Sequence, residues 1–217
     1  MTELVWTNND FDVFTIDGLE PRMSALITQV RPKFEELGGI FAAYFSAQLG
    51  EEFFPHVAKH ARRKTNPPND SWVAFAPYKR GYKAMPHFQI GLFESHLFIN
   101  LAVIYEAPNK VNIAKTLLNN RDSFEKLPDS FYISGDHMSP KSQSITTSLE
   151  DGTAEKLLAR FRDVKKGEII VGLEIPRDEA ITLKSKELLQ TIETTFDQLL
   201  PIYKLMVGAP KEAPTYA

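Results

Sequence analysis

The segment from Leu97 to Tyr105 places apolar side chains at both odd and even positions, and Asn100 is its main polar interruption. Successive side chains of a β-strand point to opposite faces of the sheet, so a strand of this composition is buried on both faces. Such a strand belongs in the middle of a sheet that other segments cover. The segment is also too short for the roughly 20 residues that a membrane-spanning helix needs. We therefore predict a central strand within a soluble globular fold.

Other runs of aromatic and β-branched residues predict further strands. These runs are Trp72 to Phe75, His87 to Phe93, His96 to Glu106, Phe131 to Ile133 and Glu168 to Ile175. A short polar break at Glu94 and Ser95 separates two of them, which favours an antiparallel hairpin. Because the strands cluster in mid-chain rather than alternating with helices, the pattern predicts an α+β fold with a largely antiparallel β-sheet flanked by helices.

Apolar residues that recur three and four positions apart predict the helices. The helical ranges are 19–37, 40–49, 111–118, 154–161 and 182–206. We expect Gly38 and Gly39 to end the first helix, Gly50 to end the second, and Pro201 to bend the last. The chain length favours a single domain over 1–217, with a flexible tail at about 209–217.

The composition excludes several classes of site. The 217 residues include no cysteine and carry a formal net charge of -3. Disulfide frameworks, thiolate zinc sites, iron-sulfur clusters and cysteine nucleophiles are therefore ruled out. Residues 1–12 offer neither the basic region nor the apolar region of a secretory signal. We expect a cytoplasmic protein that does not enter a membrane.

Residues 56–83 are basic within this acidic chain. They contain seven Lys or Arg, two His and one Asp. A local positive charge of this size indicates an anionic partner. The candidate ligand-binding residues of the stretch are Arg62, Arg63, Lys79, Arg80 and Lys83. If the flanking strands pair, the two basic loops can converge near one edge of the sheet and focus positive potential on one cleft.

The strand from His87 to Phe93 adds two polar candidates. His87, Gln89 and Gly91 alternate with apolar residues, so the imidazole and the amide share one face of the sheet. We expect that face to line a polar pocket, with His87 as the first candidate for proton transfer, because histidine titrates nearest neutrality. The alternative is that His87 is a hydrogen-bonded structural residue and that Gly91 marks a β-bulge.

Two classes of function fit the basic stretch. In the first, the protein binds a small molecule that bears phosphate or carboxylate, with or without a reaction. In the second, it is an interaction module that docks nucleic acid or an acidic protein without catalysis, with Trp72, Tyr78 and Tyr82 as stacking residues. The negative net charge and the lack of RNA-module motifs favour the small anion. The usual glycine-rich phosphate loops are also absent, and the sequence predicts no cofactor.

Two further patterns are weak as sites. His56 and His60 are four positions apart, but no third ligand is close in sequence, so we predict no metal site there. In the segment Ser134 to Ser139, serine, aspartate and histidine are neighbours. Catalytic triads are assembled from residues that are distant in sequence, so this segment is predicted to be a turn.

Several blocks of the sequence resemble a known family. Among them are Val57-Ala58-Lys59-His60-Ala61-Arg62-Arg63, Asn66-Pro67-Pro68-Asn69-Asp70, Lys79-Arg80-Gly81-Tyr82-Lys83 and Pro86-His87-Phe88-Gln89-Ile90-Gly91-Leu92. In order and spacing they are similar to the YktB-like proteins of low-GC Gram-positive bacteria. The resemblance implies a cytoplasmic α+β protein, similar in topology to the antiparallel core of biotin ligases and class II synthetases. It carries over no catalytic residue, and it makes Arg62, Arg63 and Arg80 the arginines to test for nucleotide binding.

Overall fold

The computed structural model describes residues 4–211, so most of the tail predicted at 209–217 lies outside the described residues. The described chain divides into two compact units. The first unit comprises 4–82, 88–99 and 174–194, and the second comprises 83–87, 100–173 and 195–211. Each unit therefore combines segments that are distant in the sequence.

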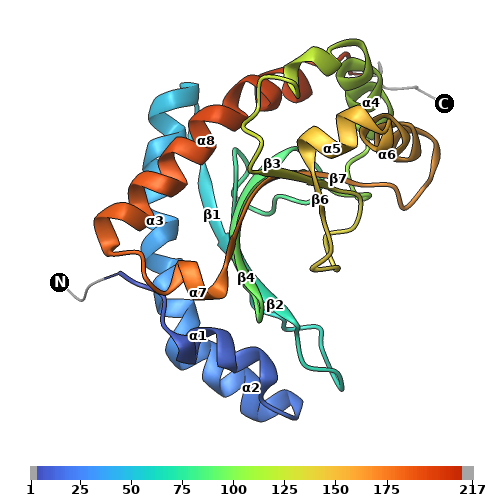
Figure 1. The fold of residues 1–217 in the computed structure, drawn as a ribbon. Coiled ribbons are helices and arrows are strands. Elements are labelled where there is room, and N and C mark those ends of the chain that lie inside the picture. Colours follow the sequence, from blue (N-terminus) through green and yellow to red (C-terminus); the bar gives the residue numbers. More distant parts are fainter. Residues whose placement is uncertain (1–3, 212–217) are drawn as a thin grey trace. The chain divides into compact units, whose positions relative to one another are not determined.

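The strands form a seven-stranded sheet in the order β1-β2-β3-β4-β7-β5-β6 (Figure 1). The strands are β1 Phe54–Val57, β2 Asp70–Ala76, β3 His87–Phe93, β4 His96–Val103, β5 Phe131–Ser134, β6 Gln143–Ser144 and β7 Ile169–Pro176. The α-helices are α1 Asn8–Asp12, α2 Leu19–Ala25, α3 Arg31–Leu49, α4 Lys110–Asn119, α5 Ile145–Glu150, α6 Thr153–Asp163, α7 Arg177–Ala180 and α8 Ser185–Val207. The α+β class and the largely antiparallel sheet are confirmed.

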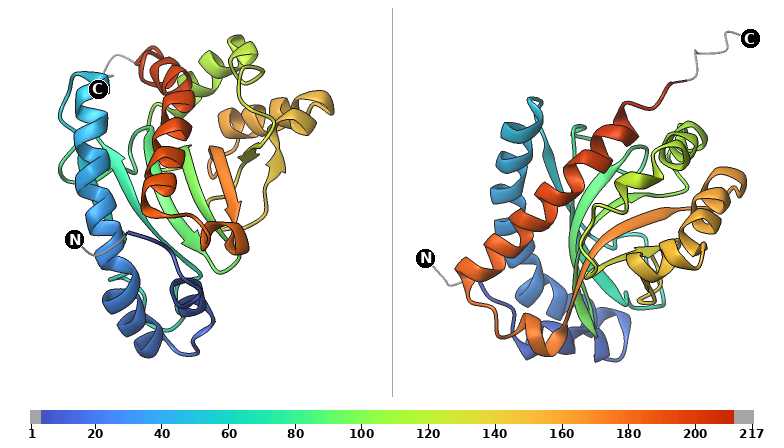
Figure 2. Two further views of the ribbon diagram at one scale, coloured as in Figure 1. Left: turned by 60° about the vertical axis from the view of Figure 1, so that its left-hand side comes forward. Right: turned by 45° about the horizontal axis from the view of Figure 1, so that its top comes forward.

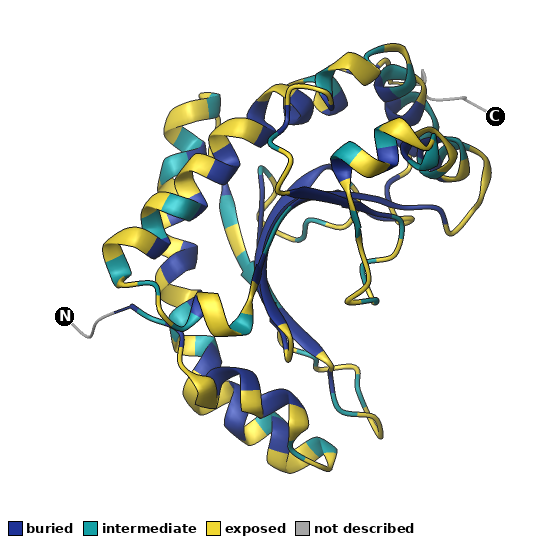
Figure 3. Ribbon diagram, viewed as in Figure 1, coloured by how far each residue is buried: buried dark blue, intermediate teal, exposed yellow. Residues whose placement is uncertain are grey.

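Strand β4 is the fourth of the seven strands and is buried at every position, which confirms the predicted central strand (Figure 3). Strand β3 is buried throughout as well, and a two-residue turn joins the two strands as a hairpin. Strand β4 ends at Val103 rather than at Glu106, because Tyr105 and Glu106 are exposed in a turn. The short elements β1, β6, α1, α5 and α7 were not predicted.

In the first unit, helix α3 covers one face of β1 and β2, and Figures 1 and 2 both show it alongside β1. Phe45 is the centre of this contact. Its ring lies 4.2 Å from that of Phe88 in a stacked arrangement and 5.3 Å from that of Phe75. Burial of these aromatic rings against each other stabilises the layer of helix on sheet.

The predicted helix break at Gly38 and Gly39 is wrong. Helix α3 continues through both glycines to Leu49 and ends at Gly50, which has the left-handed φ of 72° expected of a helix terminus. A Cβ on Gly38 would lie 3.0 Å from the Cβ of Pro55 on β1, whereas one on Gly39 would meet nothing within 4 Å. Gly38 therefore serves the close approach of helix and strand.

A π-helix, Leu26–Val30, connects α2 to α3. The sequence pattern predicted one continuous helix over this region and gave no sign of the extra residue per turn. Single π turns are rare and occur often at functional sites. The first residue after this turn is Arg31.

In the second unit, β5 pairs with β6 and β7 in antiparallel register, and α4 packs against α6. The ammonium group of Lys110 on α4 donates to three carbonyl oxygens at and after the C-terminal end of α6. They are those of Phe161, Val164 and Gly167, at 2.9, 2.6 and 3.1 Å. The carbonyl of Phe161 belongs to the last turn of α6, where carbonyl groups lack a partner within the helix, and those of Val164 and Gly167 belong to the turn that follows. Lys110 thus fixes the turn that leads into β7.

Among residues 4–211, no helix combines the length and the apolar character required to cross a membrane.

Gly91 is predicted to be intolerant of any side chain. A Cβ at this position would lie 2.2 Å from Cζ of Phe98 and 2.7 Å from the backbone oxygen of Ser71. We expect Gly91→Ala to lower the free energy of unfolding by about 2 kcal/mol, as overpacking of a dense core does. Gly39→Ala, in the exposed part of α3, should instead raise it by up to about 1 kcal/mol. Urea unfolding followed by circular dichroism measures both, and equal effects of the two substitutions would contradict this packing.

Candidate functional site

The two basic loops leave β2 at opposite ends. Loop 58–69 joins β1 to the start of β2, and segment 77–82 follows the end of β2. The seven residues of β2 separate the end of the first loop from the start of the second by about 20 Å. Pairing of the flanking strands therefore does not by itself bring Arg62 toward Lys79 and Arg80, and all three side chains are exposed.

Aromatic residues link segment 77–82 back to the strands. The indole Nε1 of Trp72 on β2 donates to the hydroxyl of Tyr82 at 2.9 Å, and Nε2 of His56 on β1 lies 3.0 Å from the carbonyl oxygen of Tyr78. His60 in the other loop lies edge-on to Trp72, with ring centroids 5.5 Å apart. Trp72 is therefore the side chain that both loops contact.

The remaining predicted residues lie in separate settings. Lys83 pairs with Glu106 at 3.0 Å in the second unit, where both side chains are well exposed. His87 is fully buried and its Nδ1 lies 2.8 Å from the carbonyl oxygen of Met85. Gln89 is buried in β3 of the first unit. The setting of His87 favours the structural alternative that the sequence left open.

Loop 58–69 is held in place by Arg22, a residue of α2 that sequence reasoning missed. The buried guanidinium donates to the carbonyl oxygen of Ile16 at 2.8 Å and to that of Pro68, also at 2.8 Å. Its Nη1 also approaches Oδ1 of Asn69 at 3.5 Å. The pKa of Arg22 is lowered mainly by burial, with an opposing effect of Asp17 and a further lowering by Arg63. Arg63 therefore lies within electrostatic range of Arg22.

The side chains of Arg63 and Arg31 belong to the same region as Arg22. Arg63 donates from Nη1 to the carbonyl oxygens of Asn66 and Pro67, both at 3.3 Å, and so braces its own loop. Burial, then Arg63, then Arg31 lower the pKa of His60 to about 4. We call the group of Arg22, Arg31, Arg63 and His60 the arginine corner.

The backbone of the arginine corner is strained at His60 and adjoins a π-helix at Arg31. His60 has a φ of 51°, the one left-handed φ of a non-glycine residue within 4–211, and Arg31 follows the π-helix directly. A residue held in a sparsely populated region costs about 1–3 kcal/mol, and such residues gather at functional sites. Nε2 of His60 lies 3.2 Å from Oγ of Ser71, which orients the ring. Local strain and charge therefore coincide.

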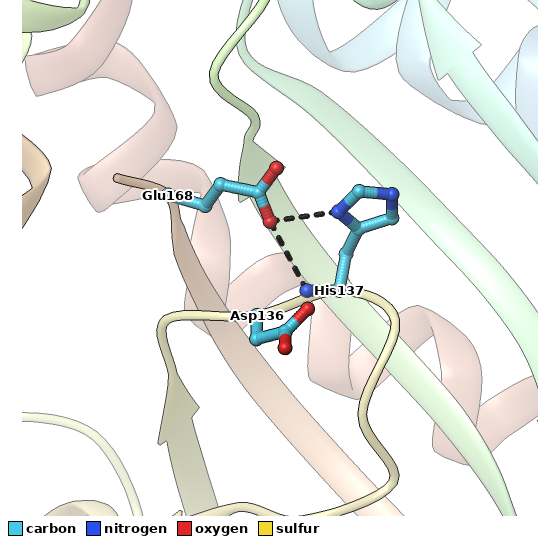
Figure 4. Close-up of side chains that lie close together, drawn as sticks. All are labelled: Asp136, His137 and Glu168. Carbon is cyan, nitrogen blue, oxygen red and sulfur yellow. Dashed lines mark hydrogen bonds and ion pairs between the residues drawn. The ribbon is translucent and has the colours of Figure 1, made fainter. Parts of the chain in front are cut away.

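A second group of polar residues lies in the second unit (Figure 4). Oε2 of Glu168 accepts from Nδ1 of His137 at 2.7 Å and from the backbone N–H of His137 at 3.1 Å. Burial would raise the pKa of Glu168, but the hydrogen bonds and charge of His137 outweigh it, so this pKa is lowered. Asp136 adds an exposed carboxylate, and ligand atoms of the three residues lie within 4.8 Å of one another.

The segment that carries Asp136 and His137 is a turn, as predicted, since the backbone N–H of Ser139 donates to the carbonyl oxygen of Asp136 at 3.3 Å. The sequence did not predict Glu168 as a partner of His137. The two residues are 31 positions apart, and Glu168 was assigned to a strand. By contrast, His56 and His60, whose spacing was considered for a metal, contact Tyr78 and Ser71.

Comparisons with known proteins give a consistent picture. A family model described as a domain of unknown function (DUF1054) matches residues 6–203. A UPF0637 protein of Lysinibacillus sphaericus (strain C3-41) is 61% identical over 208 residues, which cover 96% of this chain and 98% of the relative. A UPF0637 protein of Bacillus thuringiensis (strain Al Hakam) is 48% identical over 206 residues, 94% of this chain and 99% of the relative. These matches confirm the family resemblance found in the sequence.

His60 and His96 provide a matched pair for testing the charge of the arginine corner. The pKa of each is lowered to about 4, by burial alone for His96 and by burial with two arginines for His60. We expect Arg31→Gln to raise the pKa of His60 and to leave that of His96 unchanged. Histidine ring resonances followed by NMR as a function of pH measure both values, and equal shifts at the two residues would contradict a local effect.

The same low pKa values predict acid sensitivity. Histidine in an unfolded chain titrates near 6.5, so the unfolded state binds more protons between pH 6.5 and about 4. The stability that depends on neutral His60 and His96 is complete above pH 6.5 and is lost as the pH falls through this range. Thermal unfolding of His96→Gln should depend less on pH between 6.5 and 4 than that of the unmodified protein.

Proposed function

Because this chain belongs to the UPF0637 family, whose description assigns no reaction, we propose its function from its geometry: it binds a small molecule that bears phosphate or carboxylate at the arginine corner. The family membership rests on the match over 6–203 and on relatives that share about half or more of their residues with this chain. The proposal concerns binding and names no reaction.

The observation that carries the proposal is that Arg22 hydrogen-bonds the loop that carries His60 and Arg63, while Arg31 lies close enough to His60 to lower its pKa. Like charges repel one another, and the repulsion is larger where side chains are partly removed from water. Arg22 and Arg63 donate hydrogen bonds to carbonyl oxygens, which carry no full negative charge. A bound anion would offset this repulsion.

Arg31 is the residue best suited to contact the ligand. Within residues 4–211 its half-buried guanidinium makes no hydrogen bond and no ion pair. Guanidinium groups bind phosphate and carboxylate through two parallel N–H···O bonds. Asp17 acts on the neighbouring Arg22 and reduces the local charge without cancelling three arginines.

The exposed cations contribute at longer range. Arg62, Lys79 and Arg80 are exposed, and charges of one sign on a surface attract an oppositely charged ligand before it binds. Lys83 and His87 belong to the second unit, and Gln89 is buried in β3. The proposal therefore keeps Arg63 as a residue that contacts the ligand. Arg62, Lys79 and Arg80 attract the ligand electrostatically without contacting it.

A docking surface for nucleic acid or an acidic protein is the second candidate. One observation favours it: Tyr78 is 48% exposed beside Lys79 and Arg80, as a stacking residue on a basic surface would be. Such a surface would bind oligonucleotides with an affinity that rises with their length and falls steeply with salt. A small anion would bind with a fixed stoichiometry.

Isothermal titration calorimetry with inorganic pyrophosphate and with citrate tests the proposal. We expect one of these anions to bind at one site per chain, and Arg31→Gln to weaken binding by about 10- to 100-fold, the range for a lost charge-assisted hydrogen bond. Arg162→Gln is the matched control, because Arg162 is partly exposed and pairs with Asp163 in the second unit.

The proposal fails if neither anion binds and if mass spectrometry of the purified protein releases no phosphorylated or carboxylated molecule. It also fails if Arg31→Gln and Arg63→Gln bind as tightly as the unmodified chain. Binding of the anion should in addition raise the pKa of His60 above about 4, since the negative charge offsets the effect of the arginines.

A further inference from the structure

We propose that Asp136, His137 and Glu168 form a binding site for one divalent transition-metal ion. The three side chains supply one imidazole nitrogen and two carboxylate oxygens, and these ligand atoms lie within 4.8 Å of one another (Figure 4). The site belongs entirely to the second unit and does not depend on the anion site proposed above.

The spacing of the ligand atoms is close to that of a bound ion. Zinc binds nitrogen and oxygen ligands at about 2.0–2.2 Å, so neighbouring ligand atoms around one ion lie about 3–4 Å apart. The nitrogen and oxygen of His137 and Glu168 are 2.7 Å apart, and the widest separation in the group is within 4.8 Å. Shifts of about 1 Å or less would place all three around a single ion.

Glu168 distinguishes this group from an ordinary acidic surface. Its side chain is only 5% exposed, and its Oε2 lies 2.7 Å from Nδ1 of His137. The backbone N–H groups of His137 and Tyr105 also point to it, at 3.1 and 3.5 Å. A buried charge is costly unless it is paired or binds a metal, so a negative group fixed in this way is suited to hold a cation.

Lys110 supports the position of Glu168 without blocking it. The two residues interact electrostatically, but the three protons of the ammonium group are directed to the carbonyl oxygens of Phe161, Val164 and Gly167. These bonds hold Gly167, the residue next to Glu168. Lys110 therefore fixes the turn that presents the carboxylate and donates no hydrogen bond to it.

The other two ligands are held by their turn. Oδ1 of Asp136 accepts from the backbone N–H of Met138 at 2.9 Å, which orients the carboxylate. Nδ1 of His137 lies 2.7 Å from Oε2 of Glu168, and an ion bound by both side chains would replace this hydrogen bond and release its proton. One imidazole and two carboxylates suit zinc or manganese, and three protein ligands leave a coordination position for water or a substrate.

Calorimetry with Zn²⁺ and electron paramagnetic resonance with Mn²⁺, both on the full chain, test the site. We expect one ion per chain. His137→Gln, Glu168→Gln and Asp136→Asn should each weaken binding more than about 10-fold, since loss of even an indirect ligand partner has an effect of this size. Asp122→Asn, which removes an exposed carboxylate paired with Lys126, should bind as the unmodified chain does.

Glu168→Gln leaves a buried amide beside His137 and can reduce folding, so circular dichroism and thermal unfolding accompany each titration. Asp136 is exposed, and Asp136→Asn is therefore the variant that separates binding from stability. The proposal is overturned if neither ion binds to the unmodified chain, or if folded Asp136→Asn and His137→Gln bind as tightly as Asp122→Asn. Neither result would affect the anion site, whose residues all belong to the first unit.

Discussion

The burial of β3 and β4 along their whole length is the constraint on which the other features depend. No position of either strand is exposed, so polar groups placed there must find partners inside the protein. Chemistry that requires solvent or a ligand is therefore confined to the loops and strand ends. Accordingly, His60 and Arg63 of the arginine corner lie in loop 58–69, and Glu168 lies directly before the first residue of β7.

The strand pattern was predictable because it depends on composition that is local in the sequence. The β3–β4 hairpin and the central place of β4 follow from alternation and from apolar residues on both faces. Gly38 was misjudged because a glycine within a helix is compatible both with termination and with close packing. The contact of Gly38 with Pro55 decides between them, and it exists only in the folded chain.

The candidate sites were less predictable, since their members come together only through tertiary structure. Arg63 was predicted from the basic stretch, but Arg22 and Arg31 lie on amphipathic helices, where arginine is common. The hydrogen bond from Arg22 to Pro68 spans 46 positions. His137 was recognised only as part of a turn, because its carboxylate partner Glu168 lies in a different segment. The predicted likeness to the core of biotin ligases stays a prediction and contributes to neither site.

In this protein, structural cations differ from candidate binding residues in whether their hydrogen-bond donors are already engaged by protein groups. Lys110 and Arg22 are both buried, and both donate to carbonyl oxygens in the turn after a helix or in a loop. All three donors of Lys110 are engaged, so it has no capacity for a ligand. Arg31 has five donors, and within residues 4–211 none of them is engaged. Arg31 lies close enough to His60 to lower its pKa, as Arg63 does. An anion stabilises such a half-buried guanidinium more than any rearrangement of neutral groups, because only the anion reduces the net charge of the arginine corner.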